Sequence, residues 1–154
     1  MSKLDVRIVK LEPMTVACTY GFGKEPEGIA SSKMTTWAKA KGFYDDPEHH
    51  PTFGFNNPDP SPGSPNYGYE IWMKVDADTT PEGDVTIKQF AGGTYAVTRF
   101  TGLSRIGEVW KQLVAWREAS PYQCGHHQWL EHLRNWTAKD LEQFVFDLYL
   151  PIEA

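Results

Sequence analysis

Glu131 is the residue of this sequence best suited to carry a negative charge into an apolar site. It lies between Leu130 and Leu133 and close to Trp129, a setting that would remove water from its carboxylate. A desolvated carboxylate attracts a cation strongly, and its pKa rises toward the range of a general acid or base. The alternative is an exposed Glu131 that pairs with Arg134, and the sequence alone leaves both open.

Glu70 is a second candidate carboxylate. It follows Tyr69 in a predicted strand that is rich in aromatic residues. Alternation along a strand would place Tyr69 on one face and Glu70 with Trp72 on the other. Either Glu70 supplies a second carboxylate to the same site as Glu131, or it faces solvent and pairs with Lys74.

Aromatic residues make up 14% of the chain, which includes six Trp. Trp37, Trp110 and Trp116 fall on helical stripes, a pattern more typical of core residues than of a binding site. The remaining rings of interest flank the loops and strands expected to wall a binding groove. The predicted ligand contacts are therefore Phe53, Phe55, Tyr69, Trp72 and Trp129.

A cluster of soft ligands raises the question of a metal site. Cys124, His126, His127 and His132 are close in sequence, but their spacing matches no closed tetrahedral zinc pattern. The chain also has no glycine-rich phosphate loop. We therefore expect no metal and no other cofactor.

The bulk properties narrow the class of protein. A length of 154 residues fits one compact domain, 1–154, and the net charge of −5 without a basic run disfavours direct binding to nucleic acid. Two cysteines do not make a disulfide framework, and no leader or membrane-spanning stretch is recognisable. We expect a cytoplasmic protein with free thiols and no membrane partner.

The elements that would position these residues come from an internal repeat. The segment Val6–Thr19 aligns without a gap on Val85–Thr98, an offset of 79 positions. Each copy continues with a helical pattern and two extended segments, the first helix ending at Gly42 and the second capped by Ser104.

This pattern predicts an α+β fold that is a tandem duplication of a β-α-β-β unit, with mainly antiparallel sheets. The internal repeats are placed at about 5–75 and 84–150. Two copies of one unit tend to pack about a pseudo-twofold axis, so we expect a ligand groove between the two halves.

Four strings together resemble the GyrI-like small-molecule-binding family, which includes the effector-binding domains of AraC-type and MerR-type bacterial regulators. They are Phe53-Gly54-Phe55-Asn56-Asn57-Pro58, Tyr67-Gly68-Tyr69-Glu70, Gly92-Gly93-Thr94-Tyr95-Ala96-Val97 and Trp129-Leu130-Glu131-His132-Leu133. The resemblance implies a tandem β-α-β-β fold, in agreement with the repeat, and a stand-alone member without a DNA-binding segment.

The resemblance also implies a function. Such proteins bind hydrophobic, cationic or planar compounds in an aromatic groove, and the position of their central Glu falls on Glu131. The role would be sensing or sequestering toxic ligands. The family usually has Tyr two positions after this Glu, where this chain has Leu133, so its ligand preference is expected to differ.

Two alternatives follow from the same resemblance. Some relatives hydrolyse cyclopropane-bearing alkylating compounds, in which case Glu131 or Glu70 would be catalytic. Others inhibit DNA gyrase by protein contact, so gyrase or a transcription regulator is the expected protein partner.

Overall fold

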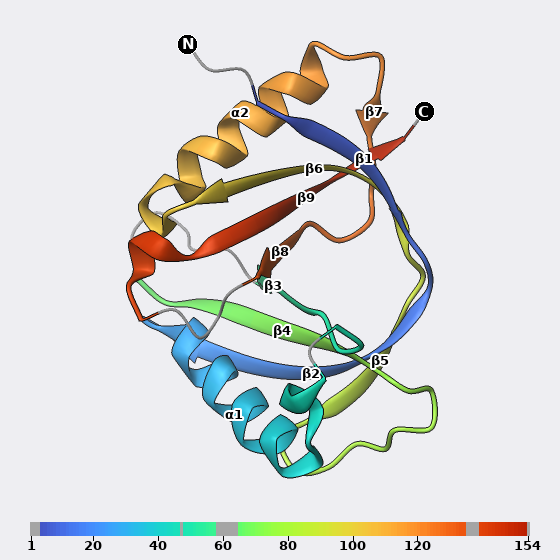
Figure 1. The fold of residues 1–154 in the computed structure, drawn as a ribbon, viewed down its shortest axis with the longest axis vertical. Helices are drawn as coiled ribbons and strands as arrows, with labels where there is room; N and C mark the ends of the chain where they lie inside the picture. Colours follow the sequence, from blue (N-terminus) through green and yellow to red (C-terminus); the bar gives the residue numbers. More distant parts are fainter. Residues whose placement is uncertain (1–3, 47, 58–64, 135–138, 154) are drawn as a thin grey trace. The chain divides into compact units, whose positions relative to one another are not determined.

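Antiparallel strands and two long helices make up the polypeptide, which divides into two units (Figure 1). The computed structural model describes residues 4–46, 48–57, 65–134 and 139–153. Unit 1 comprises Met1–Glu12 with Gly92–Ala154, and unit 2 comprises Pro13–Ala91. Because each unit combines an antiparallel sheet with a helix, the predicted α+β class is confirmed.

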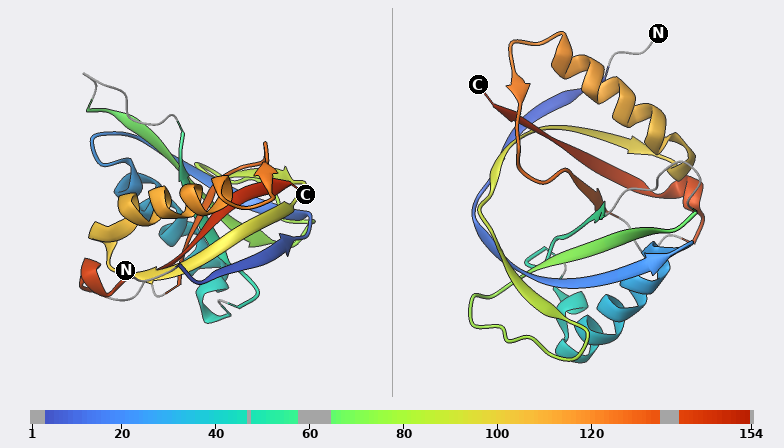
Figure 2. Two further views of the ribbon diagram at one scale, coloured as in Figure 1. Left: turned by 90° about the horizontal axis from the view of Figure 1, so that it is seen from above. Right: turned by 180° about the vertical axis from the view of Figure 1, so that it is seen from behind.

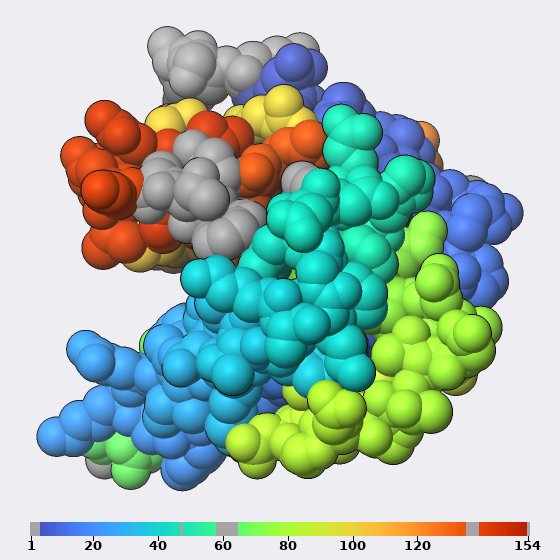
Figure 3. All heavy atoms as spheres, turned by 60° about the horizontal axis from the view of Figure 1, so that its bottom comes forward, coloured from blue at the N-terminus to red at the C-terminus, as the bar shows by residue number. Residues whose placement is uncertain are grey.

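Unit 2 contains a four-stranded sheet in the order β5, β2, β4, β3. Its strands are β5 (Thr86–Phe90), β2 (Met14–Gly23), β4 (Tyr67–Val75) and β3 (Thr52–Asn56). Helix α1 (Pro26–Lys41) covers one face and is followed by the short 3-10 helix η1 (Phe43–Asp45). In Figure 3, α1 and the residues after it, coloured blue to cyan, form one continuous surface. The core beneath α1 consists of Ala17, Met34, Trp37, Ala38, Met73, Val75 and Val85.

Unit 1 repeats this arrangement with the order β1, β6, β9, β8. Its strands are β1 (Val6–Leu11), β6 (Gly93–Thr101), β9 (Val145–Glu153) and β8 (Leu130–Leu133), with β7 (Gln123–Cys124) paired to β9. Helix α2 (Ile106–Glu118) lies beside β6 and β9 in the views of Figures 1 and 2. The short helices η2 (Leu103–Arg105) and η3 (Leu141–Gln143) complete the unit. Its core contains Ala96, Phe100, Val109, Leu113, Phe146, Leu148, Leu150 and Ile152.

The two units share one topology, as a duplicated β-α-β-β unit predicts. Leu11 pairs with Gly93, and the residues at the 79-position offset, Phe90 and Met14, pair with each other. The first strand of each sequence copy therefore pairs within the unit formed mainly by the other copy. The repeat pattern did not reveal this exchange. Because β1 and β5 have similar sequences, either strand could pair with β2 or with β6, and the sequence does not distinguish the two arrangements.

The helix ends follow the predictions in one case only. Gly42 adopts the left-handed conformation with φ of 76°, and its N–H donates to Ala38 and Lys39, so it ends α1 as expected. Ser104 does not cap α2. It lies within η2, and its hydroxyl donates instead to Glu142, which leaves α2 to begin at Ile106.

Gly68→Ala is expected to destabilise unit 2, because a Cβ at this β4 position would overlap the backbone oxygen of Asn57 and the hydroxyl of Tyr20. Overpacking of this kind lowers the free energy of unfolding by about 1–3 kcal/mol, which urea denaturation would detect as a lower midpoint concentration. Gly28→Ala is the matched control. A Cβ on Gly28 in α1 meets no described heavy atom within 4 Å, so this variant should gain about 0.5–1 kcal/mol. Equal stability of the two variants would contradict the close approach at Gly68.

Candidate functional site

Each unit buries one carboxylate on the sheet face opposite its helix. In unit 2, Tyr20 pairs with Glu70; in unit 1, Arg99, which lies 79 positions after Tyr20, pairs with Asp147. Glu70 is 5% exposed and Asp147 is 1% exposed. The two carboxylates therefore occupy equivalent positions in the duplicated fold. A carboxylate this deeply buried remains an anion only where hydrogen-bond donors and cations surround it.

The residue that follows β3 in unit 2 is equivalent to the residue that follows β8 in unit 1, and each donates to the buried carboxylate of its unit. The backbone N–H of Asn57 donates to Gly68 at 2.7 Å, as that of Arg134 donates to Val145 at 2.8 Å. Held in this way, the Asn57 amide donates to Glu70 at 2.5 Å and the Arg134 guanidinium donates to Asp147 at 3.3 Å. The same backbone turn thus supplies a neutral donor in unit 2 and a cation in unit 1.

Four hydrogen-bond donors surround Glu70. Besides Asn57, they are the Lys88 ammonium at 2.8 Å, the Trp72 indole at 3.0 Å and the Cys18 thiol at 3.2 Å. Burial alone would raise the pKa of Glu70, but the hydrogen bonds from Lys88 and the other donors outweigh it and hold the pKa below its ordinary value. Glu70 is therefore a permanent anion near neutral pH, balanced by one cation.

The partners of Glu70 are fixed in their protonated forms. Burial would lower the pKa of Lys88, but its hydrogen bond to Glu70 outweighs this and raises the pKa. Burial and the neighbouring Glu70 raise the pKa of the Cys18 thiol to about 11. A thiol with so high a pKa is a poor nucleophile, so Cys18 acts here as a hydrogen-bond donor.

Of the five predicted aromatic contacts, three share the Glu70 face, whereas Tyr69 lies on the opposite face and Trp129 belongs to unit 1. Phe53 pairs with Trp72 and Phe55 with Glu70, so all four side chains lie on one side of the sheet. The Phe55 and Trp72 rings meet edge to face with centroids 4.8 Å apart, and both are buried. Tyr69 lies on the opposite side, where its ring covers Gly54. The predicted alternation along β4 is therefore correct, and it separates Tyr69 from the other rings.

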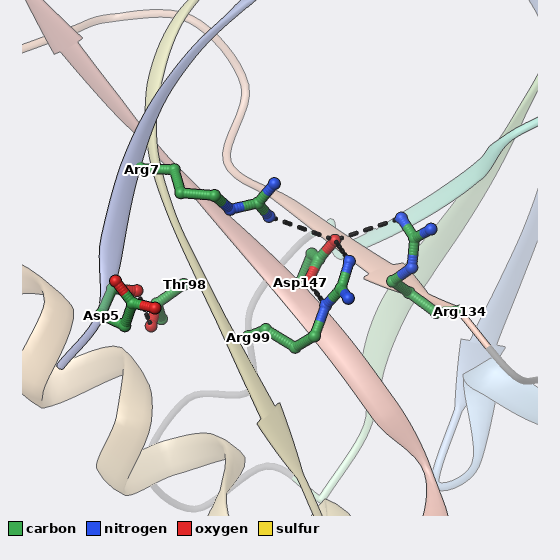
Figure 4. A network of polar contacts seen from close by, with 6 residues as sticks. All are labelled: Asp5, Arg7, Thr98, Arg99, Arg134 and Asp147. Atoms are coloured by element: carbon green, nitrogen blue, oxygen red, sulfur yellow. Dashed lines mark hydrogen bonds and ion pairs between the residues drawn. The ribbon is translucent and has the colours of Figure 1, made fainter.

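Asp147 is held by three arginines rather than by one lysine (Figure 4). Arg99 on β6 binds it with two nitrogens, Nε at 2.8 Å and Nη2 at 3.1 Å. Arg134 after β8 and Arg7 on β1 contact the same carboxylate oxygen at 3.3 Å and 3.6 Å. Burial would raise the pKa of Asp147, but Arg99 and then Arg134 and Arg7 outweigh it and hold the pKa below its ordinary value.

The sequence reading missed Asp147 and its arginines. Simple alternation with Phe146 and Leu148 facing the core places Asp147 on an outer face, yet β9 is buried on both faces over most of its length. One signal was available, since a lone Asp between Phe146 and Leu148 is unusual in an apolar strand. The three arginines gave no signal, because they come from three separate segments of the chain.

Glu131 and Trp129 belong to a different part of unit 1. Glu131 pairs with Leu148, a core residue under α2, so it lies on the sheet face that α2 covers. The Trp110 indole of α2 donates to the Glu131 carboxylate at 3.4 Å, and the Trp110 and Trp129 rings lie 5.3 Å apart. Trp129 is 39% exposed, and the Arg117 guanidinium lies over its ring at 5.9 Å. This group is a half-buried carboxylate beside two indoles, one of them open to solvent.

The residues considered for a metal have other contacts. His127 bonds through Nε2 to the Thr94 carbonyl at 2.7 Å, and the Cys124 thiol donates to Gly125 at 3.4 Å. Within residues 4–46, 48–57, 65–134 and 139–153, no group of three or more His, Cys, Asp or Glu is arranged to hold a metal ion. Neither α1 nor α2, nor any shorter helix of the described chain, is long and apolar enough to span a membrane.

Comparison with known proteins identifies a family. Residues 7–152 match the family described as integron-associated effector binding protein. Among curated proteins, none matches the chain.

Solved structures share the fold at low sequence identity. The EcmrR C-terminal domain superposes with a TM-score of 0.72 at 14% identity, over 97% of this chain and 98% of that domain. In the EcmrR–DNA complex, the matched part is 57% of the EcmrR chain. A hydrolase from Listeria innocua superposes with a TM-score of 0.72 at 11% sequence identity, over 98% of this chain and 93% of the hydrolase chain. SAV2435 bound to tetraphenylphosphonium superposes with a TM-score of 0.56 at 10% sequence identity, over 98% of this chain and 95% of the SAV2435 chain.

The pH dependence of folding is expected to report on His132, which pairs with Asp147 across β8 and β9. Burial, followed by the charge of Arg134, lowers the pKa of His132 from 6.5 to about 4. The unfolded chain binds this proton below pH 6.5 while the folded chain does not, so stability falls as the pH drops through this window. The loss between pH 7 and pH 5 is about 2 kcal/mol.

Urea denaturation of His132→Gln at the two pH values tests this prediction. The variant should lose most of the pH-dependent difference, whatever its absolute stability. His126→Gln, which removes an exposed histidine from the same segment, should retain the difference shown by the parent. An unchanged difference in His132→Gln would show that another group takes up the proton.

Proposed function

The chain belongs to the family of integron-associated effector-binding proteins, and we propose that it binds small hydrophobic cations with planar or aromatic groups. The observation that carries the proposal is the half-buried Glu131 carboxylate beside Trp110 and the exposed Trp129. Carboxylate and indole faces both attract a cation, and a desolvated cation–π contact is worth about 2 kcal/mol. Tetraphenylphosphonium, an aromatic cation bound by the structural neighbour SAV2435, is of this class.

Glu131 is a better candidate than Glu70 for the ligand charge. Glu131 is half-buried beside the Trp110 indole, and the Trp129 ring close to it is 39% exposed, so both groups are within reach of solvent. Glu70 is 5% exposed, the Lys88 ammonium lies at 2.8 Å from it, and the Phe55 and Trp72 rings around it are buried. We therefore assign Glu131 and Trp129 to the ligand, with Trp110 behind them. Phe53, Phe55 and Trp72 are assigned to the packing around Glu70.

The charges around Glu70 disfavour it as the general acid or base of a hydrolase. A general acid or base works best with a pKa near the operating pH, and the pKa of Glu70 is instead held below its ordinary value. The structural neighbour from Listeria innocua is described as a hydrolase, but at 11% sequence identity the similarity extends only to the fold.

The biological use proposed for this binding is regulation. The family is defined by effector binding, and the EcmrR chain that contains the similar domain was solved on DNA. A transcription regulator is thus the favoured partner, with sequestration of toxic cations as the alternative use. The net charge of −5 fits a role without direct contact to nucleic acid.

Titration of the protein with tetraphenylphosphonium, followed by Trp fluorescence and by calorimetry, tests the site. The parent should bind with quenching, because Trp129 lies at the proposed contact. Glu131→Gln keeps the shape of the side chain and removes its charge, so its Kd should rise at least about tenfold, equivalent to about 1.4 kcal/mol.

Glu118→Gln is the matched control. Glu118 is the last residue of α2, its side chain is 72% exposed and its distance from Arg117 is 3.8 Å. This variant removes the same formal charge from the same unit, and its Kd should stay within about twofold of the parent. If Glu131→Gln and Glu118→Gln bound tetraphenylphosphonium equally well, Glu131 would not be the cation contact.

A further inference from the structure

We propose that the sheet face of unit 1 that carries Asp147 binds the anionic group of a small organic acid, a carboxylate or phosphate attached to a planar ring. The charges carry this inference. Arg7, Arg99 and Arg134 converge on one carboxylate, which balances one of their three positive charges (Figure 4). Among the described residues, Asp147 is the one acid within ion-pair distance of these guanidinium groups, so the cluster retains an excess positive charge.

The arginines also retain donors for a ligand. Arg99 uses Nε and Nη2 on Asp147, whereas Arg7 and Arg134 each use one nitrogen. A guanidinium has more N–H donors than these contacts engage, in a fork that matches carboxylate and phosphate oxygens. The side chains of Arg7, Arg99 and Arg134 are 52%, 50% and 44% exposed, so the remaining donors can reach a ligand from solvent.

Burial of the carboxylate does not explain so many cations. The equivalent Glu70 in unit 2 is held by one ammonium and three neutral donors. One cation is therefore sufficient for a carboxylate at this position of the fold. Bringing two further guanidinium groups together costs repulsion between like charges, and a bound anion would remove that cost.

The surroundings suit a planar acid rather than a bare ion. Tyr149 and Val97 pair across β9 and β6 on the same face as Arg7, and His132 lies opposite Asp147. Val97 and Tyr149 are themselves buried, so the half-exposed guanidinium groups are what this face offers to a ligand, and none of these neighbours adds a negative charge. Half-exposed guanidinium planes also stack on flat aromatic rings, which a ligand of this class would supply.

This inference goes beyond the proposed cation site and uses different residues. Glu131 lies on the sheet face covered by α2, whereas Asp147 and its arginines lie on the opposite face. Each site can therefore be tested while the other is kept intact.

Calorimetry with three ligands of the same ring tests the anion site: 2-naphthoate, neutral 2-naphthamide and cationic 2-naphthylmethylammonium. At low ionic strength, the parent should bind 2-naphthoate at least about tenfold more tightly than 2-naphthamide. Added salt should weaken 2-naphthoate more than the amide, because half-exposed charges are screened. Inorganic phosphate should compete with 2-naphthoate for the same donors.

Arg7→Gln and Arg134→Gln should each raise the Kd for 2-naphthoate about tenfold, and Arg7→Lys should recover part of the loss. Lys10→Gln is the matched control. It removes one positive charge from the same strand, and because Lys10 is an odd number of positions from Arg7 it points to the other face. This variant should bind 2-naphthoate like the parent.

Two results would overturn the proposal. One is a parent protein that binds 2-naphthoate no better than 2-naphthamide, and the other is equal 2-naphthoate binding by Arg7→Gln and Lys10→Gln. Tetraphenylphosphonium binding by the same variants separates the two sites. It should remain unchanged in Arg7→Gln, so loss of anion binding alone concerns the Asp147 face and leaves the Glu131 assignment unaffected.

Discussion

A buried carboxylate on an inner strand of each sheet is the constraint on which the rest of this structure depends. Removing a carboxylate from water without compensation costs several kcal/mol, so both Glu70 and Asp147 must be met by charged donors. Neither β4 nor β9 supplies those cations. They come from β5 in unit 2 and from β6, β1 and the residue after β8 in unit 1, and the carboxylate is satisfied only when all of these have their native register.

This constraint gives the exchange of first strands an electrostatic consequence. Strand β5 belongs to the second sequence copy, yet its Lys88 holds Glu70 of unit 2. Strand β1 belongs to the first copy, yet its Arg7 contacts Asp147 of unit 1. In both units, the strand contributed by the other copy thus carries a counter-ion for the buried acid.

The sequence was sufficient for the fold class and the order of elements, but not for the exchange of first strands, and it was only partly sufficient for the site. A gapless repeat with a fixed offset carries the topology, because strand and helix periodicities are local properties of the chain. Local pattern also predicted the faces of β4 correctly, with Glu70 and Trp72 opposite Tyr69. It could not reveal the Asp147 cluster, whose members meet only through pairing across four strands. Glu131 was singled out for its apolar neighbours, but register alone shows that it lies under α2.

Duplication followed by divergence accounts for the different chemistry of the two carboxylates. Asn57 and Arg134 follow the equivalent strands β3 and β8 and make the same backbone bond, but one donates from a neutral amide and the other from a cation. Glu70 therefore forms a balanced ion pair with Lys88, whereas Asp147 lies among three arginines whose positive charge exceeds its own negative charge. In both cases the donors hold the carboxylate ionised. What differs between the units is the charge around the buried acid, which is one ammonium in unit 2 and three guanidinium groups in unit 1.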